Sequence, residues 1–388
     1  MPTIMSLILT LVLATATATA LRGEVISNTQ LRRTKLGNVV GAQDGNIVNK
    51  KWRGEYALVG MAYGECRFTA CQNQSRGACG FGTGRFLVWT SPTLGDNSWS
   101  EPVEILPGSD RPTDAIYFRP HVAWSLATKK WVLWVRWLPL EGPRLSDDPT
   151  LYLSAVSDSL TGPYVIAQRN VSMFYPNSAD DNLFVDSDGT GYIVHTSRAT
   201  GTKIVVEQLT ADLTQTAGTR SDLIGPGGTE APAMFKRYGV YYVTFANLCC
   251  YCTSGKETWV YRSTHALGPY VWDSTLGNAP GAQQNFVFPW VVDAASALGA
   301  GQVMWSGNRW GSDPVHTRPL FDYSLQYWSL LRFRSNGSTL PIVWEEQIHL
   351  TSSELRPPEM SPPEMAAGRQ VEFRRVRPSW PPSRSEAA

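Results

Sequence analysis

Three acidic residues stand at the start of three short apolar segments that lie far apart in the sequence. They are Asp44, Asp180 and Glu230, in the segments DGNI, DDNLFVD and EAPAMF. Cleavage of a glycosidic bond needs two facing carboxyl groups, one to protonate the leaving oxygen and one to activate a water. A third carboxylate nearby raises the pKa of the proton donor through like-charge repulsion. These residue types therefore point to glycoside hydrolysis, provided that the fold brings them together.

Each acid also has a simpler interpretation. Asp44 precedes a glycine and could be a plain turn residue, and Asp186 and Asp188 fit a hairpin turn completely. Asp181 alternates with its acidic neighbour and should point to the opposite face of a strand. Glu230 is harder to explain in this way, because a strand that starts before Ala-Pro does not call for glutamate.

The elements that would position these acids recur along the chain. A turn runs into a short strand built around Tyr, Trp or Val five times, roughly every 50–75 residues, which is the signal of a radial β architecture. These segments are 54–60, 130–134, 191–195, 239–243 and 301–305. The apolar runs are short, alternate with period two and end at Gly, Pro, Asn or Asp. We therefore predict an all-β, five-bladed β-propeller with blades near 42–105, 116–170, 178–225, 229–285 and 286–350.

The innermost strand of each propeller blade lines the central channel, so that its first residues lie at one mouth of the channel. We expect the five inner strands to begin near Asp44, Arg119, Asp180, Glu230 and the stretch 285–288. The three carboxylates would then converge despite their distance in sequence.

The two ends of the chain differ from the middle. Residues 1–20 combine a short apolar core with Ala-x-Ala spacing, which predicts a secretory signal peptide and an extracellular protein; an anchor that stays attached is the alternative. We expect residues 21–38 to be a leader and 39–350 to be the propeller. Residues 351–388 are rich in Pro, Ser and Arg, and this composition predicts disorder.

Secretion also suits the cysteines and the glycosylation signals. The six cysteines form two clusters, Cys66/Cys71/Cys79 and Cys249/Cys250/Cys252, which predict disulfides of unknown pairing. A zinc site is the weaker alternative, because two clean Cys-x-x-Cys pairs are missing. Three Asn-x-Ser triplets, at Asn73, Asn170 and Asn336, are acceptor sites for N-glycans.

Composition limits the partners. The 34 basic and 33 acidic residues leave no electrostatic footprint for nucleic acid or an anionic membrane. The partner we expect is a polysaccharide or oligosaccharide substrate, bound by a monomer. The 15 Trp and 15 Tyr could fill the wedges between blades or stack on sugar rings. As a sugar platform at the channel mouth we predict Tyr63, Phe118 and Trp310, with Arg119 as a further substrate-binding residue.

Other catalytic templates are absent from the sequence. It contains no Gly-x-Ser-x-Gly elbow, no His-Glu-x-x-His and no P-loop. The glycines between 80 and 84 lack a strand–helix context, and the five histidines are scattered.

At the three acids the chain resembles glycoside hydrolase family 43, five-bladed propeller glycosidases that act on arabinan, xylan and galactan side chains. The resemblance covers about 39–350 and rests on the order and spacing of the three acidic segments, on Arg119-Pro120 and on the repeated Gly-Pro-Tyr phrases. It implies an inverting mechanism with Asp44 as general base, Asp180 as pKa modulator and orienter, and Glu230 as general acid. The segments 306–310 and 322–328 look most like the exo-β-1,3-galactanase branch.

The chain departs from the family pattern in several places. The galactanase branch lacks the base aspartate that is present here as Asp44, and Gln43 stands where relatives often carry His. The resemblance also implies a structural calcium near a fifth-blade histidine, for which His316 is the nearest candidate, although its local sequence does not match. We therefore expect no required cofactor and assign no metal ligands, with a structural calcium as the open alternative. The alternative to a hydrolase is a glycan-binding propeller that has lost turnover.

Overall fold

The computed structural model describes residues 24–52, 54–64, 84–112, 115–139, 151–249, 251, 253–290 and 302–350. The predicted signal peptide, the predicted disordered tail and the triplet at Asn73 lie outside these residues. Within them the chain forms antiparallel strands and three single-turn 3₁₀ helices, Gly108–Asp110, Arg198–Thr200 and Phe321–Tyr323.

The described strands form six sheets; five of them are blades in chain order, each running from an inner to an outer strand, and the sixth is a two-stranded sheet. The first blade is β2 (Gln43–Trp52), β3 (Glu55–Ala62), β4 (Arg85–Ser91) and β5 (Val103–Glu104). The second is β6 (Ala115–Ser125), β7 (Lys130–Pro139), β8 (Leu151–Ser157) and β9 (Val165–Gln168). The third is β10 (Ser178–Val185), β11 (Gly191–Ser197), β12 (Lys203–Leu209) and β13 (Thr216–Arg220). The fourth is β14 (Thr229–Arg237), β15 (Val240–Asn247), β16 (Thr258–Ser263) and β17 (Val271–Gly277). The fifth is β18 (Gln283–Trp290), β19 (Gln302–Arg309) and β20 (Leu325–Leu330).

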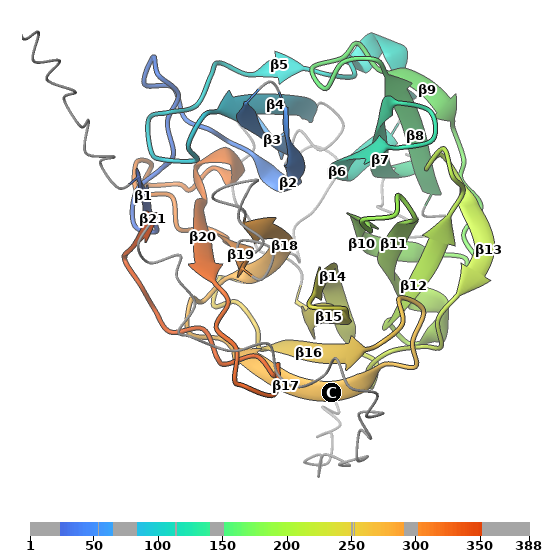
Figure 1. Ribbon diagram of the computed structural model, residues 1–388. Coiled ribbons are helices and arrows are strands. Elements are labelled where there is room, and N and C mark those ends of the chain that lie inside the picture. Colours follow the sequence, from blue (N-terminus) through green and yellow to red (C-terminus); the bar gives the residue numbers. More distant parts are fainter. Residues whose placement is uncertain are drawn as a thin grey trace, which may run out of the picture.

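The five sheets stand around a common centre, with β2, β6, β10, β14 and β18 innermost (Figure 1). The predicted five-bladed propeller is confirmed. Three inner strands begin within two residues of Asp44, Asp180 and Glu230, as expected. The second starts at Ala115, four residues before Arg119, and the fifth at Gln283, two residues before the expected stretch 285–288, so Gln283 and Gln284 belong to the last blade.

Five apolar clusters of buried side chains fill the wedges between neighbouring blades, including the wedge between the last and the first. Large aromatic side chains supply much of this packing; Trp89, Trp134, Trp305 and Trp328 are each at most 2% exposed. Each blade is therefore covered on both of its faces by its neighbours. The large aromatic side chains fill these wedges, which explains why the repeated segments are so rich in Trp and Tyr.

The N-terminal segment closes the ring. The strand β1 (Glu24–Ser27) pairs with β21 (Gln347–Leu350) beside the fifth blade. Asn28 then pairs with the edge of β20, because its side chain accepts the Trp328 N–H at 2.8 Å and donates to the Trp328 carbonyl at 2.9 Å. The Ser27 N–H in turn bonds to Asp96 of the first blade. Part of the segment expected to be a leader therefore packs as part of the fold.

Within the described part of the chain, no helix has the length and apolar character needed to cross a membrane.

Candidate active site

All five inner strands carry a β-bulge near their start, at equivalent places in the five blades. The pairing with the neighbouring strand shifts between Gln43 and Asn46, Phe118 and His121, Ser178 and Asp181, Glu230 and Ala233, and Gln284 and Phe286. A bulge breaks the alternation of the strand and re-aims a side chain, and such bulges are common next to active sites. The predicted site residues Asp44, Arg119, Asp180 and Glu230 thus lie in or directly beside these bulges.

The backbone at these bulges is unusual. Asp44, Arg119 and Ala231 have φ angles of 53°, 51° and 53°, in the left-handed region that residues with a Cβ rarely adopt. Gly45 is required beside Asp44, because a Cβ there would lie 1.8 Å from the Val59 carbonyl oxygen. The glycine after Asp44 is therefore explained by the close approach of β2 to β3. A plain turn is not needed to account for the Asp44-Gly45 pair.

The three predicted carboxylates meet around the Arg119 guanidinium, which is 3% exposed. Arg119 Nε lies 3.2 Å from Asp180 Oδ1. Burial lowers the pKa of Arg119, but the carboxylates of Asp180, Asp44, Asp181 and Glu230 lie close enough to raise it above its ordinary value. The charges of acids from the first, third and fourth blades thus act on one buried cation from the second, and Asp180 is in direct contact with it. Arg119, predicted to bind substrate, is firmly tied into this carboxylate cluster.

Asp44 is 5% exposed and accepts a hydrogen bond from the Tyr63 hydroxyl, with 2.6 Å between the oxygens. Burial is the largest influence on its carboxyl and raises the pKa, and the charge of Asp180 adds to this. Arg119, Tyr63 and His121 oppose the shift, but the pKa stays above its usual range. A carboxylate of raised pKa is a stronger proton acceptor, as a general base requires.

Asp180 behaves in the opposite way. Burial raises the pKa of its carboxyl, but Arg119, Arg136 and Arg198 outweigh this and hold the pKa below the ordinary value. The Arg136 guanidinium lies 3.4 Å from the same oxygen that Arg119 binds. Asp180 therefore stays ionised at neutral pH and supplies a fixed negative charge, in keeping with the modulating role implied by the resemblance.

Glu230 is 8% exposed at the start of β14. Its Oε1 accepts the backbone N–H of Cys249 at 2.5 Å and the side-chain amide of Gln283 at 2.8 Å. Cys249 is disulfide-bonded. The other five cysteines lie outside the described residues, so the pairing stays a prediction.

The predicted sugar platform is only partly supported. Tyr63 and Trp310 are 2% and 1% exposed, which is too little for a sugar ring to stack on them, so this prediction is wrong for both. They belong to an aromatic cluster with Phe321, with ring centroids 4.9 Å from Phe321 to Tyr63 and 5.4 Å to Trp310. Phe118 is half-buried, with the Arg136 guanidinium 5.2 Å from its ring centre, and remains a candidate.

Sequence reasoning missed several residues that hold this site together. The polar pair Gln283-Gln284 opens the fifth inner strand in the place that Glu230 has in the fourth, and that position was the available signal. Asp322 accepts the backbone N–H groups of Tyr63 at 2.6 Å and Gly64 at 2.8 Å. Burial raises the pKa of Asp322 to about 7, although these two hydrogen bonds oppose the shift.

A metal site does not emerge from the described residues. Within them, no group of three or more His, Cys, Asp or Glu side chains is placed to hold a metal ion. His316 instead bonds to Asp313 in the same loop, with 2.9 Å between Nδ1 and Oδ2, and packs against the Tyr323 ring. These contacts do not fit a calcium ligand, and no step below uses a metal.

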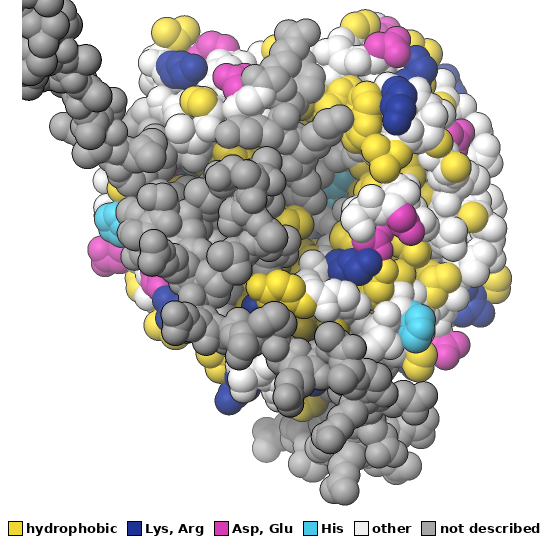
Figure 2. Space-filling view, viewed as in Figure 1, with side chains coloured by type: hydrophobic (Ala, Val, Ile, Leu, Met, Phe, Trp, Pro, Cys, Tyr) yellow, Lys and Arg dark blue, Asp and Glu magenta, His cyan; other side chains and the backbone are white. Residues whose placement is uncertain are grey.

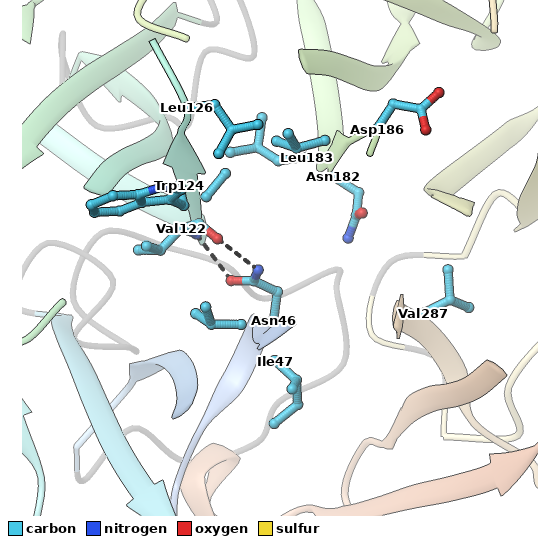
Figure 3. A pocket seen from close by; sticks show the side chains of 12 residues that line it. Asn46, Ile47, Val122, Trp124, Leu126, Asn182, Leu183, Asp186 and Val287 are labelled. Carbon is cyan, nitrogen blue, oxygen red and sulfur yellow. Dashed lines mark hydrogen bonds between the residues drawn. The ribbon is translucent and has the colours of Figure 1, made fainter. Parts of the chain in front are cut away.

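A cavity of about 190 Å³ lies further along the channel, lined by residues that follow the site residues on the inner strands. Asn46 spans its wall, because its side-chain amide exchanges two hydrogen bonds of 3.0 Å with the Val122 backbone (Figure 3). Asn182, Leu183 and Val287 also border this space. The cavity lacks a facing pair of carboxyl groups among its lining residues, so we place the chemistry at the carboxylates around Arg119.

The surface shown in Figure 2 is hollowed near its centre, with hydrophobic side chains at the border of the hollow. On the part of this face that is not drawn in grey, charged side chains of both signs are scattered. This agrees with the nearly equal numbers of basic and acidic residues.

Comparison with known proteins extends these observations. The family model for glycosyl hydrolases family 43 matches residues 146–284, a range that contains Asp180 and Glu230. No curated protein matches the sequence.

Three solved structures show the same fold. A family 43 β-1,3-galactosidase has a TM-score of 0.66 at 22% identity, over 84% of this chain and 64% of that chain. A second β-1,3-galactosidase, solved with galactodeoxynojirimycin, has a TM-score of 0.63 at 22% identity, over 83% and 99%. An exo-β-1,3-galactanase from Clostridium thermocellum has a TM-score of 0.67 at 19% identity, over 84% and 66%.

The chain spans less than two thirds of the length of the first and third of these proteins. The likeness to solved structures establishes the fold, and the family model covers the blades that carry two of the three acids. The chain is thus similar to glycosyl hydrolases family 43 over residues 146–284, and it shares the five-bladed fold of the solved galactosidases and galactanase.

Proposed function

We propose that the protein is an inverting glycosidase that removes terminal galactose residues from β-1,3-linked galactan. The observation that carries this proposal is the convergence of Asp44, Asp180 and Glu230 on Arg119. The pKa of Asp44 is raised and that of Asp180 is lowered, and such a difference between neighbouring carboxyl groups supports separate acid and base roles.

In the proposed reaction, Glu230 gives its proton to the oxygen that leaves with the rest of the chain. The bond between this oxygen and the anomeric carbon breaks, while a water oxygen attacks that carbon from the opposite face. Asp44 takes a proton from the attacking water, and the product is galactose of inverted configuration. Asp180 stays ionised between Arg119 and Arg136, and its charge favours the protonated form of a neighbouring acid.

The choice of galactose rests on the structural neighbours. Two of them are β-1,3-galactosidases and one is an exo-β-1,3-galactanase. Arabinan and xylan side chains are the other substrates that the family resemblance implies, and they serve as comparison substrates below.

We further propose that the protein is secreted. The segment 1–20 has the pattern of a signal peptide, and Cys249 is disulfide-bonded, which suits an oxidising compartment. The triplets at Asn170 and Asn336 lie in described segments where both asparagines are exposed, as glycan attachment requires.

The test is hydrolysis by the purified protein of β-1,3-galactobiose, arabinan and xylan, with the first product followed by ¹H NMR. We expect α-galactose to appear first from the β-linked disaccharide. Retained β-configuration would refute the inverting mechanism, and faster release from arabinan or xylan would refute the choice of galactan. Binding of the disaccharide without cleavage would favour the alternative, a glycan-binding propeller.

A further inference from the structure

Two consecutive glutamines at the start of β18 repeat the same arrangement. Gln283 Oε1 accepts the indole N–H of Trp310 at 2.7 Å, and Gln284 Oε1 accepts the indole N–H of Trp305 at 2.9 Å. Both glutamines are buried, 6% and 1% exposed, and both point their amide nitrogens across to the fourth blade. An indole N–H can only donate, so each tryptophan fixes which end of its glutamine carries the oxygen.

The first glutamine reaches the proposed acid. Because Trp310 holds the oxygen end, the NH₂ group of Gln283 faces Glu230 and donates to Oε1 at 2.8 Å. The same NH₂ group donates to the Cys249 carbonyl at 3.0 Å. The Cys249 backbone is thus held by Gln283 through its carbonyl, while its own N–H donates to Glu230 Oε1.

Two donors on one carboxyl oxygen have a chemical consequence. A carboxyl oxygen has two lone-pair directions in its plane, and on Oε1 both are taken by N–H donors, which leaves Oε2 to carry the proton of the acid. The donors also stabilise the negative charge that remains once the proton has left. We propose that Trp310 and Gln283 are positioning residues that, with the Cys249 main chain, fix the carboxyl of Glu230 so that Oε2 delivers the proton to the leaving group. This inference rests on the proposed glycosidase function.

The second glutamine provides a matched comparison. The NH₂ group of Gln284 donates to the backbone carbonyls of Ala231 and Thr244. It joins the same two blades with the same number of bonds, but its amide donates to backbone oxygens rather than to a carboxylate. Loss of Gln284 should therefore weaken the fold without changing proton delivery.

The experiment compares Gln283→Met with Gln284→Met, since methionine keeps the length of the side chain and removes its polar atoms. Each variant is assayed on β-1,3-galactobiose, whose leaving group needs protonation, and on 2,4-dinitrophenyl β-galactoside, whose leaving group does not. For Gln283→Met we expect kcat on the disaccharide to fall on the order of 100-fold and kcat on the aryl galactoside to change by less than about 5-fold. For Gln284→Met both rates should change by the same small factor. Equal losses of kcat on both substrates in Gln283→Met would overturn the proposal. They would show that Gln283 contacts the attacking water or the sugar, or that the substitution damages the whole site.

A second pair of variants covers the case in which a methionine variant does not fold. Trp310→Phe and Trp305→Phe remove one indole donor each and keep both glutamines. We expect kcat on the disaccharide to fall selectively in Trp310→Phe and not in Trp305→Phe. A selective fall in Trp305→Phe, or no selective fall in either variant, would count against the assignment.

A measurement without turnover separates this inference from the proposed function. The ¹³C carboxyl signal of Glu230, identified by its absence in Glu230→Gln, is titrated in wild type and in the Gln283→Met and Gln284→Met variants. Loss of a donor that favours the ionised form should move the titration midpoint upward in Gln283→Met alone. Wild-type protein that cleaves no galactoside but shows this shift would refute the substrate and leave the positioning role standing. An unchanged midpoint would refute the positioning role even in an active enzyme.

Discussion

The hydrogen bond from Tyr63 to Asp44 makes a quantitative prediction for the Tyr63→Phe variant. The phenol is 2% exposed and its oxygen lies 2.6 Å from Asp44 Oδ2, so phenylalanine fills the same space and removes only the donor. A hydrogen bond to a charged group contributes about 1.5–3 kcal/mol, which corresponds to a factor of roughly 10–150 in rate if the base must be held by it. We expect kcat/KM on galactobiose to fall by a factor in this range.

The pH dependence of the same variant has a definite sign. The Tyr63 hydroxyl lowers the pKa of Asp44 against the raising effect of burial, so its removal raises that pKa further. A base of higher pKa becomes protonated at a higher pH. The acidic limb of the kcat/KM profile should therefore move to higher pH in Tyr63→Phe, with part of the lost rate recovered in alkaline buffer.

The control is Tyr242→Phe. Tyr242 is equally buried and donates to the Gly337 carbonyl at 2.8 Å, at a point where its partner is not a catalytic acid. We expect a similar small loss of stability by thermal denaturation and an unchanged pH profile. A profile that shifts by the same amount in both variants, or an acidic limb that moves to lower pH in Tyr63→Phe, would refute the assignment of Asp44 as the base.

Three further predictions follow from the same contacts. Glu230→Gln should abolish cleavage of galactobiose and spare the dinitrophenyl galactoside, whereas Asp44→Asn should abolish both; a normal rate in Asp44→Asn would show that the first-blade aspartate is dispensable. Asn28→Ala removes three hydrogen bonds, two of them to the Trp328 backbone, and should lower the free energy of unfolding in urea by about 2–4 kcal/mol, with activity retained at temperatures where the variant is folded. The pKa of Asp322 is about 7 in the fold against 3.8 in the unfolded chain, so the folded state holds more protons between these values and wild type loses stability as the pH rises through them. Asp322→Asn loses a hydrogen-bond acceptor and should be less stable than wild type at pH 5. Thermal denaturation should show this difference in stability narrowing toward pH 8, because only wild type loses stability as the pH rises. A difference that widens would contradict the argument.

The sequence was sufficient to predict the architecture because the repeated strands carry a strong local signal. Each inner strand begins at a polar residue and continues as an apolar run, and these starts are visible without knowledge of the neighbouring blades. The acids were predictable for the same reason: Asp44, Asp180 and Glu230 interrupt apolar strands at places where secondary structure alone does not need them, and the structure brings them together around Arg119.

The aromatic platform failed because exposure depends on other blades. Trp310 and Tyr63 directly follow the strands β19 and β3, which made them candidates. Phe321 from the loop after β19 and Tyr251 from the fourth blade pack against Trp310. No local pattern in the sequence specifies that contact. Gln283 escaped notice for a related reason: a neutral amide at the start of a strand has many structural uses, and only its neighbours, Trp310 and Glu230, reveal which one applies.

The contacts that build the site also hold the blades to one another. The Arg119–Asp180 pair joins the second and third blades, and Gln283 joins the fifth to Glu230 of the fourth. Asp322 of the fifth blade binds the main chain at Tyr63 of the first. A substitution at the site therefore changes the packing of two blades as well as the chemistry, and a fall in activity alone cannot distinguish these effects. Substrates that differ only in their leaving group do distinguish them, because a loosened blade lowers both rates, whereas a displaced acid lowers only the rate that depends on its proton.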